Sequence, residues 1–384
     1  MSRRAVWTLL LVLSVAGCTG GRERVTFPTA PATPATAAPA SSARTSTTPG
    51  QTPIARETIA TGLPVPWGLA FLPDGTALVT LRDHGEVLHV TDGSAPVSAG
   101  HVPGVEPDGE GGLLGIAVSP AFASDRAVFA YLTSHDDNRV IRMTFDGTSL
   151  KPGPVILKGI AKAGNHDGGR LAFGPDGFLY ISTGDAARRD PAQDNGSLSC
   201  KILRVTRDGA PAPGNTFQGS PVWSLGHRNV QGMAWTRTTT RSGTQTWTMY
   251  ASEFGQNTWD ELNRIEPGRN YGWPVVEGIA HRTGFVDPLV QWPTDDASPS
   301  GIAVGTDGAL YLAALRGESL WRVPLDSNGN AGKPQRLLQG TYGRLRTVVT
   351  APDGRLWLVT SNTFRGTPRP GDDRILALRL PIQQ

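Results

Sequence analysis

Short apolar runs that meet across a tight polar turn recur along most of the chain. One unit, Trp67–Leu81, reads WGLAFLPDGTALVTL, in which two alternating, β-rich runs flank a Pro-Asp-Gly turn. Turn residues of this kind supply the backbone angles of a hairpin, so each unit predicts two antiparallel strands. Five further units pair two such runs across a Pro-Asp-Gly or similar turn: Leu113–Thr133, Gly169–Thr183, Gln231–Glu253, Ser300–Leu315 and Arg346–Ser361.

Six such units predict an all-β fold, a six-bladed β-propeller, because their spacing is that of propeller blades or somewhat wider. Short outer segments supply a third strand to some blades: Gly85–Val90, Asp260–Ile265 and Ser319–Val323. A β-sandwich with many hairpins is the alternative, but its strands would not repeat one turn six times. In a propeller, the loops around the central channel carry the function.

The N-terminus follows a different pattern. Arg3 and Arg4 precede an apolar run, from Ala5 to Val15, that is too short to span a bilayer. The end of this run, Val15-Ala16-Gly17-Cys18, resembles a bacterial lipobox. We therefore expect a lipoprotein signal peptide over residues 1–17, with cleavage before Cys18 and a lipid on its sulfur. An ordinary signal peptide with a chance cysteine is the alternative.

Residues 18–56 are rich in Ala, Pro, Thr and Ser and contain almost no large apolar side chains, so they predict a tether. The folded domain is then residues 57–381. We expect it to be exported and held at the outer face of the bacterial cell membrane by the lipid anchor alone. Cys200 is the only cysteine besides Cys18, which excludes a disulfide within the domain.

Charge changes this picture little. The chain has 36 Lys and Arg residues against 33 Asp and Glu residues, and removal of Arg3 and Arg4 with the signal peptide nearly balances the two. Nothing in that balance favours a nucleic-acid partner.

The first candidate for chemistry is His166, which lies between Asn165 and Asp167 directly ahead of the third unit. Its position predicts that it faces the axial mouth of the channel. Because imidazole titrates near neutrality, His166 is suited to take a proton from a hydroxyl as a general base. Alternatively, the Asn-His-Asp turn uses its side chains only to satisfy nearby backbone groups.

A second polar group stands just ahead of the fourth unit. The segment SLGHRNVQGMAW carries His227, Arg228, Asn229 and Gln231 into a buried strand. Polar groups that are buried without partners are costly, so these side chains pair internally or bind a ligand.

A third group is cationic. Arg316 lies in the fifth unit, and Arg344 and Arg346 lie at the start of the sixth. Residues two apart on a strand point the same way, so Arg344 and Arg346 form a two-pronged clamp. Together, three arginines at blade mouths favour an anion with several carboxylates.

Four segments, in this order, resemble the soluble pyrroloquinoline-quinone (PQQ)-dependent sugar dehydrogenases: GNHDGGRLAFGPDGFLYISTGD, SLGHRNVQGMAW, SEFGQNTWDELNRIEPGRNYGWP and GRLRTVVTAPDGRLWLVTSN. That group includes glucose, aldose sugar and sorbosone dehydrogenase-like proteins. The resemblance covers nearly all of residues 57–381. It implies a propeller that binds PQQ and oxidises a small-molecule sugar, and the family also contains cofactor-free relatives that bind other molecules.

The resemblance also implies roles for single residues. His166 matches the family's catalytic base, which takes the proton from the anomeric hydroxyl while hydride passes to the quinone. Arg228 matches the arginine that stabilises charge on the quinone oxygen. Asn229 lies in the same cofactor-contacting segment, and Arg344 and Arg346 would bind carboxylates of the cofactor.

Calcium is a further implication of the resemblance. Gly255 and Gln256 match the pair whose backbone carbonyls hold the calcium bound to the cofactor, and oxygen ligands suit this hard cation. Glu261 and the backbone of Tyr271 resemble part of a second, structural calcium site.

Two cofactor-binding positions depart from the family pattern. Arg316 stands where the characterised enzymes have a lysine, which keeps the charge but changes the geometry of carboxylate contact. Glu110 stands where they have a glutamine against the cofactor. A carboxylate at that position repels a tricarboxylate ligand unless calcium or an arginine intervenes.

We therefore expect a quinoprotein dehydrogenase that oxidises an aldose or a related polyol and passes electrons to an unknown acceptor. One alternative is a cofactor-free propeller that acts as a binding module of the cell envelope. Another is a calcium-dependent lactonase, which would need several side-chain carboxylates around its metal.

Overall fold

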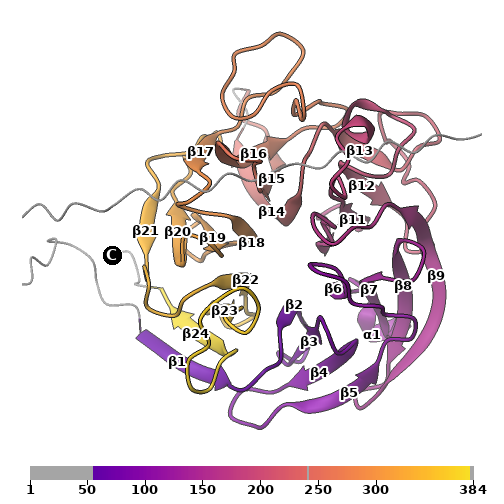
Figure 1. Ribbon diagram of the computed structural model, residues 1–384, viewed down its shortest axis with the longest axis vertical. Coiled ribbons are helices and arrows are strands. Elements are labelled where there is room, and N and C mark those ends of the chain that lie inside the picture. Colours follow the sequence, from indigo (N-terminus) through magenta and orange to yellow (C-terminus); the bar gives the residue numbers. More distant parts are fainter. Residues whose placement is uncertain (1–54, 240–241, 381–384) are drawn as a thin grey trace, which may run out of the picture. The chain divides into compact units, whose positions relative to one another are not determined.

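The computed structural model describes residues 55–239 and 242–380, and these form six four-stranded antiparallel sheets around a central axis (Figure 1). The predicted six-bladed propeller is confirmed, and the β-sandwich alternative is wrong. Each of the six repeated units forms the first two strands of one blade. Cys18, the predicted signal peptide and all but the last two residues of the predicted tether lie outside the described residues.

The first three blades follow the chain order outward from the axis. Blade 1 contains β2 (Pro66–Phe71), β3 (Ala77–Leu81), β4 (Glu86–Val90) and β5 (Val97–His101). Blade 2 contains β6 (Leu113–Val118), helix α1 (Phe122–Asp125), β7 (Ala127–Thr133), β8 (Asn138–Phe145) and β9 (Leu150–Ile160). Blade 3 contains β10 (Leu171–Phe173), β11 (Leu179–Ser182), the 3-10 helix η1 (Asp190–Gln193), β12 (Lys201–Val205) and β13 (Val222–Leu225).

The other three blades complete the ring. Blade 4 contains β14 (Val230–Thr239), β15 (Gln245–Glu253), β16 (Trp259–Ile265) and β17 (Val290–Pro293). Blade 5 contains β18 (Pro299–Val304), β19 (Leu310–Ala314), β20 (Ser319–Val323) and β21 (Gln335–Leu337). Blade 6 contains β22 (Leu345–Thr350), β23 (Leu356–Thr360), β24 (Ile375–Arg379) and β1 (Ala55–Ala60).

The ring is closed by a strand pair from distant parts of the sequence. β1 pairs antiparallel with β24, with Glu57 opposite Ala377, so the first described strand is the outer strand of the last blade. The backbone hydrogen bonds of this pair hold blade 6 together without a disulfide. The predicted third strands are confirmed as β4, β16 and β20.

The innermost strands are irregular near their first residues. In five of the six blades, the register between the first and second strands shifts there, for example between Val230 and Gly232 in blade 4. A β-bulge re-aims a side chain, here that of Gln231, and a matching bulge in blade 6 re-aims Arg346. The two side chains meet, since Arg346 Nη1 donates to Gln231 Oε1 at 2.7 Å.

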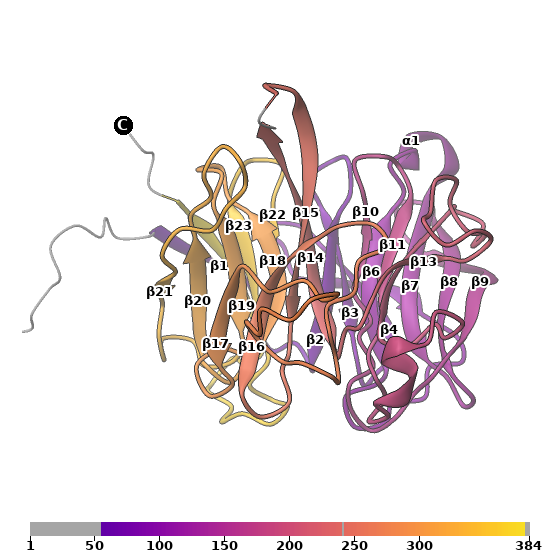
Figure 2. The same cartoon turned by 90° about the horizontal axis from the view of Figure 1, so that it is seen from above.

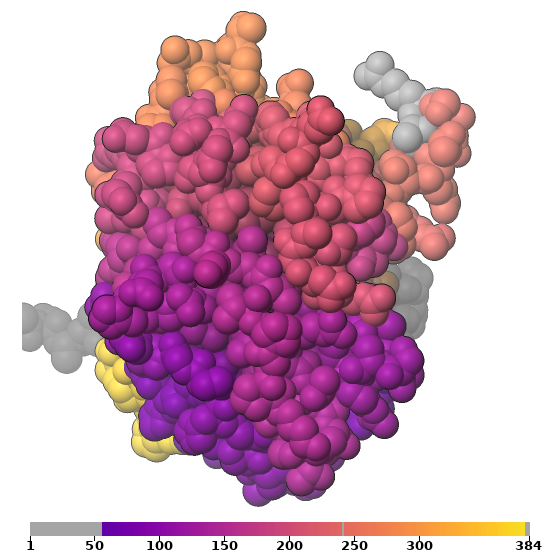
Figure 3. Space-filling view, turned by 90° about the vertical axis from the view of Figure 1, so that its right-hand side faces the viewer, coloured from indigo at the N-terminus to yellow at the C-terminus, as the bar shows by residue number. Residues whose placement is uncertain are grey.

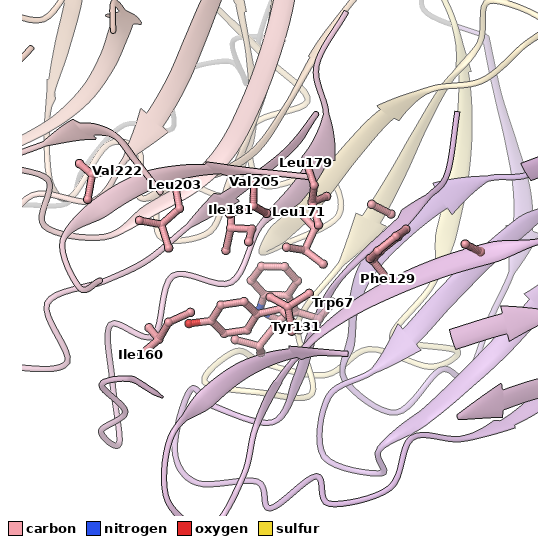
Figure 4. Close-up of a cluster of buried hydrophobic side chains, with 14 of the residues drawn as sticks. Trp67, Phe129, Tyr131, Ile160, Leu171, Leu179, Ile181, Leu203, Val205 and Val222 are labelled. Carbon is pink, nitrogen blue, oxygen red and sulfur yellow. The ribbon is translucent and has the colours of Figure 1, made fainter. Parts of the chain in front are cut away.

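Apolar side chains fill the space between neighbouring blades. Figure 4 shows one such cluster, in which Trp67 of blade 1 lies with Tyr131 of blade 2 and Leu171 of blade 3. The hydroxyl of Tyr131 donates to the carbonyl of Asp167 at 2.8 Å. This buried contact fixes the segment that carries His166, so the core positions the candidate base.

The propeller presents two different faces. On one face, loops join the first and second strands of each blade, with helix α1 in the loop of blade 2, and the β14–β15 hairpin projects beyond its neighbours (Figures 2 and 3). On the other face, the chain enters the innermost strands, and the entering segments carry Glu110, His166, Arg228, Asn229 and Arg344. Within the described ranges, no helix is long and apolar enough to cross a membrane.

Candidate functional site

Four entering loops converge at one mouth of the central channel. Glu110 lies ahead of β6, His166 ahead of β10, Arg228 ahead of β14 and Arg344 ahead of β22. Side-chain contacts link the first three of these loops, as described below. The structure therefore brings together residues that are far apart in the sequence.

The ring of His166 is held at both nitrogens. Nδ1 lies 2.9 Å from Asp185 Oδ1, and Nε2 lies 2.9 Å from Arg228 Nη2. A guanidinium can only donate, so Nε2 is the acceptor and Nδ1 carries the proton that is donated to Asp185. The His166 side chain is 16% exposed and that of Asp185 only 3%. The imidazole is thus neutral with its basic nitrogen toward Arg228, which is the form that a general base requires.

The backbone at His166 is constrained as well. Its φ of +60° lies in the left-handed region, which is uncommon for a residue with a side chain. Its N–H donates to Glu110 Oε2 at 3.1 Å, and its carbonyl accepts from the N–H of Ala186 at 3.1 Å. In this turn it is Asp167 that satisfies a nearby backbone group, the N–H of Ala163, whereas the His166 ring does not.

Arg228 is oriented by contacts from all three of its side-chain nitrogens. Nε donates to Gln256 Oε1 at 3.0 Å, Nη1 to the carbonyl of Phe254 at 3.1 Å, and Nη2 to His166. The residue is 6% exposed, and this burial lowers its pKa, against the opposing effect of Asp185 and other carboxylates. A fixed, buried cation beside the basic nitrogen of His166 is suited to stabilise negative charge on a ligand.

Four arginines gather near Glu110: Arg82, Arg344, Arg346 and Arg365. Burial lowers the pKa of Arg346 well below its usual range, and the charges of Arg82 and Arg344 lower it further. Burial and then the charge of Arg365 lower the pKa of Arg344. Arg82 and Arg365 have carboxylate partners, whereas Arg344 and Arg346 make no ion pair within the described residues. The cluster therefore carries an excess of positive charge.

Several donors of this site are buried without a hydrogen-bond partner. They are Arg82 Nη1, Arg344 Nε, Arg346 Nε and Asn229 Nδ2. Asn229 itself is fully buried, and its Oδ1 accepts from the N–H of Gly168 at 3.1 Å, so its orientation is fixed. Leaving a buried donor unsatisfied costs about 1–3 kcal/mol. These donors and the excess charge match an anionic ligand that has several acceptor oxygens.

Glu110 is bound at both carboxylate oxygens. Oε2 accepts from the backbone of His166, and Oε1 pairs with Arg365 Nη1 at 2.5 Å. Burial raises the pKa of Glu110, but the His166 N–H, Arg365 and Arg346 outweigh burial and hold it below its usual value. Arg365 therefore offsets the negative charge of Glu110, as the sequence analysis required if an anionic ligand is to bind beside this carboxylate.

Gly255 and Gln256 lie in the loop after β15, in contact with Arg228 through the Gln256 side chain. Glu277 Oε1 shapes this loop, since it accepts from the N–H groups of Gln256, Thr258 and Trp259. Within the described residues, the carbonyls of Gly255 and Gln256 accept no hydrogen bond, so both remain available to a cation.

Glu261 and Tyr271 line a common cavity of about 10 Å³, together with Glu253 and Glu277. This volume is about that of one water molecule or one ion. Burial and the charge of Glu253 raise the pKa of Glu261 to about 8. A cation bound in the cavity would lower this pKa, because it favours the ionised carboxylate. In the described part of the chain, no three His, Cys, Asp or Glu side chains form a metal site alone, so a cation here would need backbone carbonyls.

Arg316 stands apart from the other predicted residues. It follows β19 on the same face, but its side chain is 60% exposed and pairs with Asp295 at 2.5 Å. No contact joins it to the four clustered arginines among the residues that the structure describes. Its role in binding a cofactor stays a prediction.

The sequence does not single out Asp185, Arg82 or Arg365. Asp185 follows β11 closely, and an acidic residue at the end of a buried strand was the available signal. Arg82 and Arg365 look like ordinary surface arginines in the sequence, yet Arg82 is 2% exposed and stacks on Phe364 at 3.7 Å. Their positions become apparent only when the blades are assembled.

The chain resembles known proteins over most of its length. Residues 63–366 match the family model described as Glucose / Sorbosone dehydrogenase. The chain is 31% identical over 340 residues to an aldose sugar dehydrogenase of Escherichia coli, a match that covers 78% of this chain and 87% of that protein.

Solved structures are similar over the same region. The PQQ-bound form of aldose sugar dehydrogenase from Streptomyces coelicolor has 52% identity and a TM-score of 0.79, covering 85% of this chain and 98% of that chain. A putative oxidoreductase (glucose dehydrogenase) from Thermus thermophilus has 40% identity and a TM-score of 0.78, covering 85% and 100%.

Proposed function

The chain belongs to the family of soluble PQQ-dependent sugar dehydrogenases, and on this premise we propose that it oxidises an aldose sugar or a related polyol with PQQ as its cofactor. One observation carries the proposal: the basic nitrogen of His166 and the guanidinium of Arg228 meet beside a buried, positively charged cluster. A base, an electrophilic cation and an anion-binding surface are the parts that such an oxidation needs.

The residues present are compatible with PQQ, which is a tricarboxylate. The orphaned donors of Arg82, Arg344 and Arg346 would bind its carboxylates, and Asn229 Nδ2 offers one further donor. Glu110 would not oppose this binding strongly, because Arg365 compensates its charge. When bound, PQQ would accept the hydride that leaves the sugar carbon.

The chain's own residues supply the proton chemistry. His166 would take the hydroxyl proton of the sugar at Nε2, and the Asp185 carboxylate would stabilise the resulting imidazolium through Nδ1. Arg228 would remain in place, because Gln256 and the Phe254 carbonyl hold its other two nitrogens. It can then stabilise negative charge that develops near His166.

Calcium is the second expected cofactor. The unbonded carbonyls of Gly255 and Gln256, beside Arg228, are ligands of the kind that calcium prefers. The cavity between Glu261 and Tyr271 would hold a second ion that offsets the buried carboxylates around it. Both sites would form only in the folded chain, so calcium would stabilise it.

We also propose that Cys18 anchors the protein to the outer face of the cell membrane. The support is the sequence alone, the apolar run that ends in Val15-Ala16-Gly17-Cys18. After fractionation, the wild-type protein should stay with the membranes through a salt wash, and Cys18→Ser should be released or mislocalised. A Cys18→Ser protein that stays membrane-bound would refute the lipid anchor.

The enzymatic proposal is tested by reconstitution. Apoprotein is loaded with PQQ and calcium, and aldoses are assayed with an artificial electron acceptor. His166→Ala should reduce turnover by roughly two to four orders of magnitude while it keeps PQQ binding. His135→Ala is the matched control, because the His135 side chain is 82% exposed.

Each outcome has a clear meaning. If the wild-type protein binds no PQQ, the alternative, a binding module of the envelope, is favoured. If His166→Ala melts at a lower temperature but keeps its turnover per folded molecule, His166 is only a turn former.

A further inference from the structure

A belt of side chains divides the central channel. Arg170 Nε donates to the carbonyl of Gln231 at 2.7 Å, and its Nη2 donates to Thr347 Oγ1 at 3.1 Å. Gln231 Oε1 in turn accepts from Arg346 and from Ser300 Oγ. We call this belt the plug; its residues are Trp67, Arg170, Gln231, Ser300, Arg346 and Thr347.

Below the plug, the channel opens into an apolar well of about 460 Å³. Each blade contributes to its wall from the later residues of its innermost strand: Leu69, Ile116, Phe173, Met233, Ile302 and Val348. The candidate active site lies ahead of these strands, so the well opens on the opposite face. Thr350 also lines the well, and its hydroxyl is already bonded to the carbonyl of Val304.

Arg170 forms the floor of the well and is the only charged residue in its described lining. The side chain stacks on Trp67, with Cζ 4.3 Å from the ring centroid, and the residue is 9% exposed. Two of its nitrogens are bonded within the plug, whereas Nη1 is accessible to solvent and has no hydrogen-bond partner among the described residues. Burial lowers the pKa of Arg170 to about 9, since no carboxylate lies close enough to compensate.

A cation at the floor of an apolar cavity is unfavourable unless an anion pairs with it. The plug fixes Arg170 in this position, and no ion pair of Arg170 occurs within the described ranges. The well is therefore complementary to a molecule with an apolar body and one negative head. Its volume is within the range of about 300–1,000 Å³ that is typical of small-molecule sites, which combine apolar walls with few polar groups.

We propose that the well binds a small amphipathic carboxylate, with its head on Arg170 and its apolar tail along the innermost strands. The carboxylate supplies the missing partner of Nη1, and the tail covers Phe173 and its neighbours, which are half-buried in its absence. The plug lies between this site and the sugar and cofactor site, to which its Arg346 also belongs.

The first experiment measures binding to the cofactor-free protein by calorimetry with three probes. Octanoate has both the tail and the charge, 1-octanol has the tail only, and acetate has the charge only. Octanoate should bind one molecule per chain, at least about tenfold more tightly than 1-octanol, and acetate should not compete. Equal binding of octanoate and 1-octanol, or no octanoate binding, would overturn the proposal.

Variants then locate the bound octanoate. Ala172→Phe fills part of the well, where Ala172 is half-buried, and should weaken octanoate binding at least tenfold. Ala95→Phe, at an exposed position outside the well, is the matched control. If Ala172→Phe binds octanoate normally, the ligand sits elsewhere, for instance on the arginine cluster, and the proposal is wrong.

Arg170→Met tests the head group. It should bring octanoate affinity down to that of 1-octanol, and a preserved preference for octanoate would contradict the proposal. If this variant does not fold, the comparison of the three probes on wild-type and Ala172→Phe protein still decides. All measurements use protein without PQQ, so they remain valid whatever the outcome of the sugar oxidation assay.

Discussion

Arg365 pairs with Glu110 across the mouth of the channel, with 2.5 Å between Nη1 and Oε1. The two residues are 255 positions apart, in the segment between β23 and β24 and in the loop ahead of β6. The pair places a negative charge beside Arg344 and Arg346, which make no ion pair within the described residues, and next to the backbone of His166. Glu110 thus occupies part of a surface that is suited to an anionic ligand.

Glu110→Gln should therefore strengthen binding of PQQ, by roughly three- to tenfold. Glutamine keeps an acceptor for the His166 N–H but removes the negative charge and frees Arg365 for the ligand. The measurement is a PQQ titration of the apoprotein at constant calcium, repeated at several salt concentrations. Because the site of the variant carries more net positive charge, its affinity for the anionic PQQ should decrease more steeply as salt is added.

Glu106→Gln is the control for this change, since it removes the same charge from an exposed position four residues earlier. Arg365→Gln should act in the opposite direction and weaken PQQ binding, because it leaves the Glu110 carboxylate without its partner. If Glu110→Gln binds PQQ no better than the wild-type protein, Glu110 does not oppose the ligand.

The fold could be predicted from the sequence because its signal is local. Pro-Asp-Gly turns in three units, other polar turns in the remaining three, and the alternation on either side of them define the first two strands of every blade. β1 carries no such turn, and its partner β24 lies at the other end of the chain, so the closing pair could not be predicted.

The site was predicted only in part, for a related reason. His166 and Arg228 stand in distinctive polar segments, whereas Asp185 becomes significant only through its contact with the His166 ring. Arg344 and Arg346 do lie together, but the reason differs from the predicted one. Arg346 is at a β-bulge, where simple strand alternation does not hold.

Asp185→Asn should reduce turnover by about ten- to a hundredfold with little change in PQQ affinity. Asparagine fills the same space but cannot stabilise an imidazolium at Nδ1, while the arginine cluster is untouched. Turnover is measured with saturating sugar, and PQQ affinity separately by titration. Asp208→Asn, at a side chain that is 81% exposed, serves as the control. Unchanged turnover in Asp185→Asn would show that His166 does not act as a base.

Calcium removal should lower the melting temperature by several degrees, because the proposed sites exist only in the native state. Melts are recorded with calcium, with a chelator, and with the chelator followed by excess magnesium. Magnesium should restore little, since it demands a smaller octahedral site. Glu261→Gln should reduce the effect of calcium, as it removes a carboxylate from the small cavity. Coincident melts in calcium and chelator would contradict both metal sites.

The last prediction concerns Asp167, whose carboxylate is 1% exposed. Oδ1 accepts from Asn138 Nδ2 at 2.8 Å and from the N–H of Ala163 at 3.1 Å, but Oδ2 is buried without a partner. Burial raises the pKa of Asp167 from 3.8 to about 7, and its hydrogen bonds only partly offset this. The folded protein therefore holds a proton that the unfolded chain releases near pH 4.

The sign of the effect follows from that difference. The stabilisation by protonated Asp167 is complete below about pH 3.8 and is lost as the pH rises through about 7. Asp167→Asn keeps the Oδ1 acceptor and cannot ionise. Relative to wild type, its free energy of unfolding should increase between pH 4 and pH 7, by up to about 4 kcal/mol, and level off above pH 8. Denaturant unfolding at several pH values measures this, with Asp208→Asn as the exposed control. Parallel curves for Asp167→Asn and wild type would mean that Asp167 is ionised throughout.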